Sequence, residues 1–143
     1  MNLPDSMTYI TCDGHGAPDV LKPATAPLPV PKRDEVLIRV LAAGVNRPDV
    51  SQRQGNYPPP PGASPVVGLE VAGEVVALGP EATDGGWKIG DRVCALANGG
   101  GYAEYCVAPA PQCLPWPTGY DRINAGALPE NMFTKAWLET KSR

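Results

Sequence analysis

Residues 42–79 read AAGVNRPDVSQRQGNYPPPPGASPVVGLEVAGEVVALG, and this stretch decides the fold. Asn46 belongs to the residue types that cap helix N-termini, and Pro48 suits the first helical turn that follows such a cap. Asp49, at the third helical position, suits the unpaired N–H groups and the positive end of the helix dipole. Gly55 suits the left-handed position that ends a helix. The pattern therefore predicts a short helix over residues 47–54.

Beyond this helix the chain becomes extended. Tyr57 comes directly before the four prolines of residues 58–61, which can only adopt the extended polyproline conformation. Residues 66–78 are mostly apolar and predict either a strand pair or one long bent strand. Gly68 and Gly73 are the expected bend points, because glycine inside a strand pattern marks a bend or a bulge.

Further short runs with period-two alternation predict more strands. The clearest covers residues 35–41, EVLIRVL, which alternate and include β-branched residues. Residues 21–32 contain four prolines and predict an extended edge segment, because each proline removes a ladder donor. Helical texture begins only at Asp121. Weaker strands are expected at residues 7–12, 93–97 and 102–108. The pattern predicts a mainly β fold with one small helix, built as a small irregular barrel.

Composition narrows the function classes. The 143 residues suit one domain, and the net charge of −3 with scattered Lys and Arg gives no footprint for nucleic acid or an anionic membrane. No stretch approaches the roughly 18 apolar residues of a membrane span. The N-terminus lacks the basic and apolar regions of a signal peptide. A cytoplasmic protein is expected.

The cysteines and the single histidine give no metal pattern. The four cysteines include no C-x-x-C pair, and without a secretory signal they are expected to be free thiols in a reducing compartment. His15 is expected to be an exposed loop residue. No metal site is predicted.

Six motifs then point to a family. In chain order, GVNRPD (44–49), RQGNYPPPPG (53–62) and GLEVAGEV (68–75) resemble the medium-chain dehydrogenase/reductase superfamily, in particular the zinc-free, zeta-crystallin-like quinone oxidoreductases. The resemblance extends over residues 7–138. Three further stretches fit the same pattern, namely WKIGDRV (87–93), GGGYAEY (99–105) and ALPE (127–130).

The resemblance implies both a fold and a reaction. Residues 1–120 would form a GroES-like catalytic domain, an irregular β-barrel with short helices, and residues 121–143 a helical lead-in to a Rossmann domain that binds NADPH. No glycine-rich nucleotide fingerprint follows in the sequence, so the chain alone is expected to show negligible turnover. The reaction implied is hydride transfer from NADPH to a quinone. Zinc is not expected, because Asn46 and Leu69 stand at the ligand positions of zinc-dependent relatives and cannot replace those ligands.

The resemblance also assigns site residues. Tyr57 is the candidate catalytic residue, placed to polarise the quinone carbonyl and donate a proton. Asn46, Thr134 and Asn131 are expected near the nicotinamide. Asp49 and Arg53 are expected to line the substrate cleft. By strand alternation, the residues expected on a solvent face are Arg39, Glu70 and Glu74, with Glu70 close enough to Gly68 to line the cleft.

Two alternatives stay open. The same scaffold and hydride would serve an NADPH-dependent enone or alkenal reductase, and the fold alone would also permit a non-catalytic GroES-like scaffold module. The oligomeric state is open as well, including a homo-oligomer. An exposed apolar patch is expected at Leu128, Met132, Phe133, Trp137 and Leu138.

Overall fold

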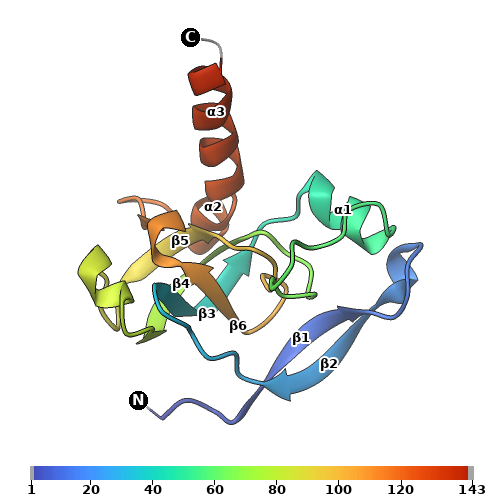
Figure 1. Cartoon of the computed structure of the whole chain (residues 1–143), viewed down its shortest axis with the longest axis horizontal. Helices are drawn as coiled ribbons and strands as arrows, with labels where there is room; N and C mark the ends of the chain where they lie inside the picture. The colour runs from blue at the N-terminus through green and yellow to red at the C-terminus, as the bar shows by residue number, and fades with distance from the viewer. Residues whose placement is uncertain (1, 142–143) are drawn as a thin grey trace.

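A computed structural model of the chain describes residues 2–141, and the surroundings of side chains as far as residue 135. Its strands form two antiparallel sheets (Figure 1). In the smaller sheet β1 (Ser6–Cys12) pairs with β2 (Leu21–Pro27). The larger sheet has the order β6-β3-β4-β5-β7. Its strands are β3 (Glu35–Ala43), β4 (Glu70–Leu78), β5 (Arg92–Leu96), β6 (Tyr105–Pro109) and β7 (Cys113–Pro115). The prediction of a mainly β, GroES-like fold is confirmed.

The central strand β4 resolves one alternative that the sequence left open. It is a single strand paired with β3 on one side and β5 on the other. Gly73 lies within β4, next to a register shift between Val40 and Ala42 of β3. A side chain at Gly73 would collide with the backbone carbonyl of Arg39. The glycine therefore permits the close approach of the two central strands.

The larger sheet buries apolar side chains on both faces, because successive residues of a strand point to opposite sides. Val71 of β4 and Val93 of β5 lie in the main core, whose other members include Val36 and Ile38 of β3. Their neighbours Ala72 and Cys94 form a second cluster with Ala125. Ala125 belongs to α2 (Arg122–Gly126), so this short helix covers the second face.

α-Helices form in both regions where the sequence pattern indicates them, residues 47–54 and the stretch from Asp121 onward. α1 (Arg47–Arg53) lies where it was expected, and its N-cap is Asn46. α3 (Pro129–Lys141) rises away from the sheets (Figure 1). Three short 3-10 helices cover Pro18–Val20, Ala82–Gly85 and Ala110–Gln112. Over the part of the chain that the structure describes, no helix is long and apolar enough to cross a bilayer.

The predicted apolar patch lies on and before α3. Met132 is half exposed, whereas Leu128 and Phe133 are partly buried. The side chains of Trp137 and Leu138 lie outside the residues whose surroundings are described. For Trp137 and Leu138 the exposed patch therefore stays a prediction.

All four cysteines are unpaired thiols. Cys94, Cys106 and Cys113 are buried in the sheet, and Cys12 is partly buried in β1. Burial raises the pKa of Cys106 and Cys113 to about 12. These thiols are consequently protonated at neutral pH and serve as small apolar core residues.

The β1–β2 connection fastens the end of α1. The Gly16 N–H donates to the Arg53 carbonyl at 3.0 Å, and Arg53 Nη1 donates to the Gly16 carbonyl at 2.8 Å. Next to this clamp, Gly55 has φ +83° and its Cα hydrogen faces the His15 ring. A Cβ at Gly55 would lie 3.0 Å from that ring. The segment that leads to Tyr57 is thus held against the connection.

Gly55→Ala is expected to lower the free energy of unfolding by about 1–2 kcal/mol, since alanine is strained at positive φ and presses on His15. Chemical denaturation measures the change. Gly62→Ala is the matched control, because Gly62 has φ +82° but open space around its Cα. The same substitution at Gly62 should cost less. Equal losses at the two glycines would contradict a contribution from the His15 contact.

Candidate active site

Glu70, the first residue of β4, is at the centre of the candidate site. Its side chain is only 2% exposed. Oε1 accepts a hydrogen bond from Asn46 Nδ2 and Oε2 accepts one from the Glu130 N–H, both at 2.8 Å. One carboxylate therefore ties the N-terminus of α1 to the first turn of α3.

The prediction that Glu70 lies on a solvent face is wrong. Strand alternation predicts which face of the sheet a side chain is on, but not whether another segment covers that face. Here the start of α3, sixty residues later in the sequence, covers it. The 43–46 loop closes the same side, where the Gly44 N–H donates to the Glu70 carbonyl at 3.1 Å. A side chain at Gly44 would collide with the Glu70 carboxylate. Arg39 and Glu74 are partly exposed and pair with each other at 3.0 Å.

Asp49 forms a second buried acidic position beside Glu70. It is 3% exposed, and its Oδ2 accepts hydrogen bonds from the Asn46 N–H at 2.8 Å and from Tyr102 Oη at 3.1 Å. Its other oxygen, Oδ1, is buried without a hydrogen-bond partner among the described residues. Burial and the neighbouring Asp49 carboxylate raise the pKa of Tyr102. Tyr102 therefore remains a phenol that donates to Asp49.

A cavity of about 200 Å³ lies next to this network. Its apolar walls come from Leu69 and Leu96, together with prolines of the polyproline run. Four polar side chains stand among the lining residues, namely Gln52, Tyr57, Asn98 and Glu130. Tyr57 is 46% exposed, so its ring is accessible. An apolar cavity with a few convergent polar groups is the usual form of a small-molecule site.

Glu130 lines this cavity and has a perturbed acidity. Its pKa is raised by burial first, and then by the negative charges of Glu70 and Asp49. Glu130 is not among the site residues that the sequence motifs predict. The only available signal was its place in the ALPE motif, which carries no information on where α3 begins relative to β4.

The structure brings some of the predicted site residues together and leaves others apart. Tyr57 lines the cavity. Asn46 is connected to the cavity by hydrogen bonds, because it donates to Glu70, which accepts from the N–H of the lining residue Glu130. Asp49 and Arg53 are buried and bonded within the protein, and neither lines the cavity. On α3, Asn131 Nδ2 donates to the Ala127 carbonyl at 3.0 Å, and Thr134 is exposed. No described contact joins Asn131 or Thr134 to Tyr57.

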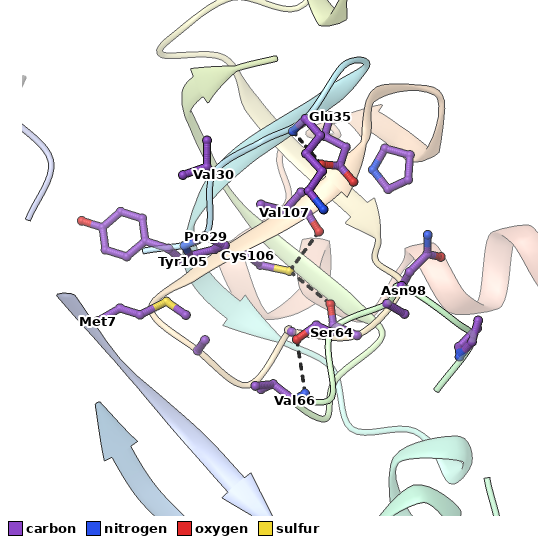
Figure 2. Close-up of a pocket in the computed structure, with 18 of the residues that line it drawn as sticks. Met7, Pro29, Val30, Glu35, Ser64, Val66, Asn98, Tyr105, Cys106 and Val107 are labelled. Carbon is purple, nitrogen blue, oxygen red and sulfur yellow. Dashed lines mark hydrogen bonds between the residues drawn. The ribbon is translucent and has the colours of Figure 1, made fainter. Parts of the chain in front are cut away.

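A second cavity of about 470 Å³ is lined by residues that include Met7, Tyr105 and Val107 (Figure 2). Pro60, Asn98 and Gly99 line both cavities and so form a shared wall. Figure 2 shows the Cys106 sulfur turned toward backbone carbonyls, and Sγ donates to those of Gly99 and Val107 at 3.8 and 3.6 Å. The buried thiol is therefore not placed to react with a ligand here.

The described residues contain no group of three or more His, Cys, Asp or Glu side chains that could hold a metal ion. The Asn46 side-chain amide donates to Glu70. Leu69 is part of the apolar cavity wall.

The curled sheet, the capped helix and the cavity beside the polyproline run define a GroES-like domain of the dehydrogenase type. The chain belongs to the alcohol dehydrogenase GroES-like domain family, whose sequence profile matches residues 32–118. Its relatives place it in the medium-chain dehydrogenase/reductase superfamily.

Relatives with assigned names agree with this placement. The chain is 35% identical over 128 residues to the mouse synaptic vesicle membrane protein VAT-1 homolog-like, covering 90% of this chain and 30% of that protein. It is 39% identical over 104 residues to a quinone oxidoreductase of Lama guanicoe, covering 71% of this chain and 31% of the relative. A trans-enoyl reductase of Trichoderma harzianum is 33% identical over 135 residues, covering 88% of this chain and 35% of that protein. The chain thus spans about a third of the length of these relatives.

Among solved structures, a mycobacterial protein complexed with NADPH superposes with a TM-score of 0.80 at 36% identity. The match covers 93% of this chain and 41% of that one. The described cavity fits only part of such a cofactor. Its volume is below the roughly 300–1,000 Å³ of drug-sized pockets, and none of its lining residues is Lys or Arg. The residues present suit a single ring, the nicotinamide or the acceptor, and provide no cation for the phosphates.

Proposed function

We propose that this chain forms the acceptor-binding part of an NADPH-dependent, zinc-independent quinone oxidoreductase. The observation that carries the proposal is the 200 Å³ cavity, in which Tyr57 stands beside apolar walls and next to the buried Asn46–Glu70–Glu130 network. Named relatives that are quinone oxidoreductases support it. Four unpaired thiols are consistent with a reducing compartment, and we place the activity in the cytoplasm.

Within the proposed site Tyr57 is the group that meets the acceptor. Its accessible phenol hydrogen-bonds the quinone carbonyl oxygen, which polarises the carbonyl. The apolar walls at Leu69 and Leu96 contact the ring faces and exclude water. A quinone is already electrophilic, so a hydrogen bond suffices where other carbonyls need a metal.

The nicotinamide half of NADPH supplies a hydride when it is bound. Asn46, Asn131 and Thr134 are proposed to hold this half of the cofactor. Asp49 and Arg53 do not line the cavity and are proposed to act as positioning residues. Asp49 fixes the Asn46 backbone, and Arg53 fixes the end of α1 to the β1–β2 connection.

Chemical-shift mapping of the 143-residue chain with 1,4-naphthoquinone tests this proposal. The largest amide shifts are expected at residues around the cavity, such as Tyr57, Leu69 and Glu130. The walls exclusive to the larger cavity, such as Val107, should not respond. Binding confined to that larger cavity, or no saturable shift at all, would contradict the proposed acceptor site.

Tyr57→Phe is expected to weaken quinone binding about tenfold, which is the loss of one hydrogen bond of about 1.4 kcal/mol. The dissociation constant comes from the same shift titration. Tyr120→Phe is the matched control, because Tyr120 is 47% exposed, close to the 46% of Tyr57, and lines neither cavity. Equal affinities for wild type and Tyr57→Phe would remove Tyr57 from the proposed role.

A second candidate function is reduction of enones or enoyl groups, which the trans-enoyl reductase relative supports. The same cavity would then hold the C=C–C=O unit, and Tyr57 would contact the carbonyl oxygen. Competition between 1,4-naphthoquinone and an α,β-unsaturated ketone for the mapped cavity separates the two. The acceptor that displaces the other at lower concentration identifies the preferred class.

A further inference from the structure

Glu130 is the one ionisable carboxyl side chain among the residues that line the acceptor cavity. It lies in the first turn of α3, and its backbone N–H donates a hydrogen bond to Glu70 Oε2 at 2.8 Å. Glu70 is itself fixed by Asn46. A buried network therefore sets where Glu130 stands relative to Tyr57.

The groups that face Glu130 favour its neutral form. Glu70 on β4 and Asp49 on α1 are both buried and acidic, and each raises the pKa of Glu130 in addition to burial. Tyr57 faces the same cavity as a phenol, and no Lys or Arg lines it. The dipole at the N-terminus of α3 acts in the opposite direction, but the net shift is upward. Glu130 thus keeps its proton to a higher pH than an ordinary glutamate.

We propose that Glu130 is the proton donor that completes reduction of the acceptor in this cavity. The proposal rests on the proposed function, since it assumes that the acceptor ring occupies the 200 Å³ cavity. It adds a catalytic residue that the sequence motifs alone do not assign.

The balance of the step is simple. A quinone that receives a hydride from a reduced nicotinamide gains two electrons and one proton and becomes the hydroquinone monoanion. The Glu130 O–H bond then breaks, its proton goes to the anionic oxygen, and a neutral hydroquinone forms. The Glu130 carboxylate that remains recovers a proton from water. The oxidant is the quinone and the reductant is the nicotinamide.

Neither tyrosine of the site is as good a proton source. The Tyr102 hydroxyl donates a hydrogen bond to Asp49 and does not line the cavity. Tyr57 does line it, but a phenol is a far weaker acid than a carboxylic acid, with reference pKa values of about 10 and about 4.3. Tyr57 is suited to hydrogen-bond the oxygen, and Glu130 to release a proton to it.

Proton-linked binding of 4-nitrophenolate to the 143-residue chain tests the proposal without turnover. This anion mimics the hydroquinone monoanion, and calorimetry in buffers of different ionisation enthalpy counts the protons taken up. At a pH high enough to ionise Glu130 in the free chain, wild type should take up about one proton per anion bound, because the anion and an ionised Glu130 cannot share the cavity. Glu130→Gln should bind the anion with nearly no uptake, and Glu130→Asp should retain most of it.

Two control variants make the result specific. Tyr57→Phe should bind more weakly but keep the uptake, since the proton taken up is assigned to Glu130. Glu74→Gln, on the same strand as Glu70 but paired with Arg39, should change neither quantity. Unchanged uptake in Glu130→Gln would overturn the assignment of Glu130 and leave the acceptor site intact. Absence of any binding to wild type would overturn the acceptor site, and the proton donor with it.

Discussion

Gly68→Ala is expected to lower the free energy of unfolding by about 2–6 kcal/mol. Gly68 has φ +107°, where an alanine is strained by about 1–3 kcal/mol. A Cβ there would also lie 2.6 Å from the Tyr102 backbone nitrogen and 2.8 Å from the Gly101 carbonyl carbon. Forcing extra volume into such a contact costs about 1–3 kcal/mol more. Together these losses amount to about 2–6 kcal/mol, a large part of the roughly 5–15 kcal/mol that hold an average domain folded.

The hydrogen bonds around Gly68 explain why the backbone there cannot shift to make room for a side chain. The Gly101 N–H donates to the Gly68 carbonyl at 3.0 Å, and the Tyr102 N–H donates to the Val67 carbonyl at 2.9 Å. Relief of the clash would break this pairing and displace Tyr102 from Asp49. Circular dichroism and urea denaturation measure the effect. Gly90→Ala is the control, with φ +92° but open space. A Gly68→Ala protein as stable as Gly90→Ala would disprove the steric account.

Glu70→Ala is expected to lower the free energy of unfolding by about 2–4 kcal/mol. The substitution leaves two donors, Asn46 Nδ2 and the Glu130 N–H, without their acceptor, and each unpaired buried group costs about 1–3 kcal/mol. Removal of a buried charge offsets part of this cost. Binding of 1,4-naphthoquinone should also weaken, because Glu130 and the start of α1 lose their common anchor.

Glu74→Ala provides the control for Glu70 on the same strand. It breaks a partly exposed ion pair with Arg39, which is worth about 1 kcal/mol or less. Glu70→Gln should fall between the two, because a carboxamide can still accept one of the two hydrogen bonds. Urea denaturation ranks the variants. If Glu70→Ala were no less stable than Glu74→Ala, the Asn46–Glu70–Glu130 network would not contribute to the stability of the fold.

Much of the fold could be predicted because its signals are local. The alternation in residues 35–41 and the cap pattern from Asn46 to Gly55 depend only on neighbouring residues, and both β3 and α1 form where they indicate. The pairing of β1 with β2 could not be predicted in the same way. Residues 21–32 carry prolines that suggest an edge, but only the tertiary structure shows which strand lies beside it.

The site was harder to predict because it depends on contacts between distant segments. Glu70 looks like a solvent-facing strand residue until α3 covers it, and Glu130 is sixty residues away from it in the sequence. Tyr57 could be singled out because the helix end and the prolines restrain it locally. The burial of Asp49 and Arg53 could not, since it follows from Tyr102 and Gly16, which approach from other parts of the chain.

The burial of the thiols bears on the survival of the protein in the presence of its proposed substrates. Quinones and enones alkylate thiolates, so an enzyme that concentrates them risks inactivating itself. Because burial raises their pKa values to about 12, Cys106 and Cys113 stay protonated at neutral pH and are poor nucleophiles. Cys94 is buried with a raised pKa as well. Cys12, the most accessible thiol, is where such damage would begin, and it does not line the acceptor cavity.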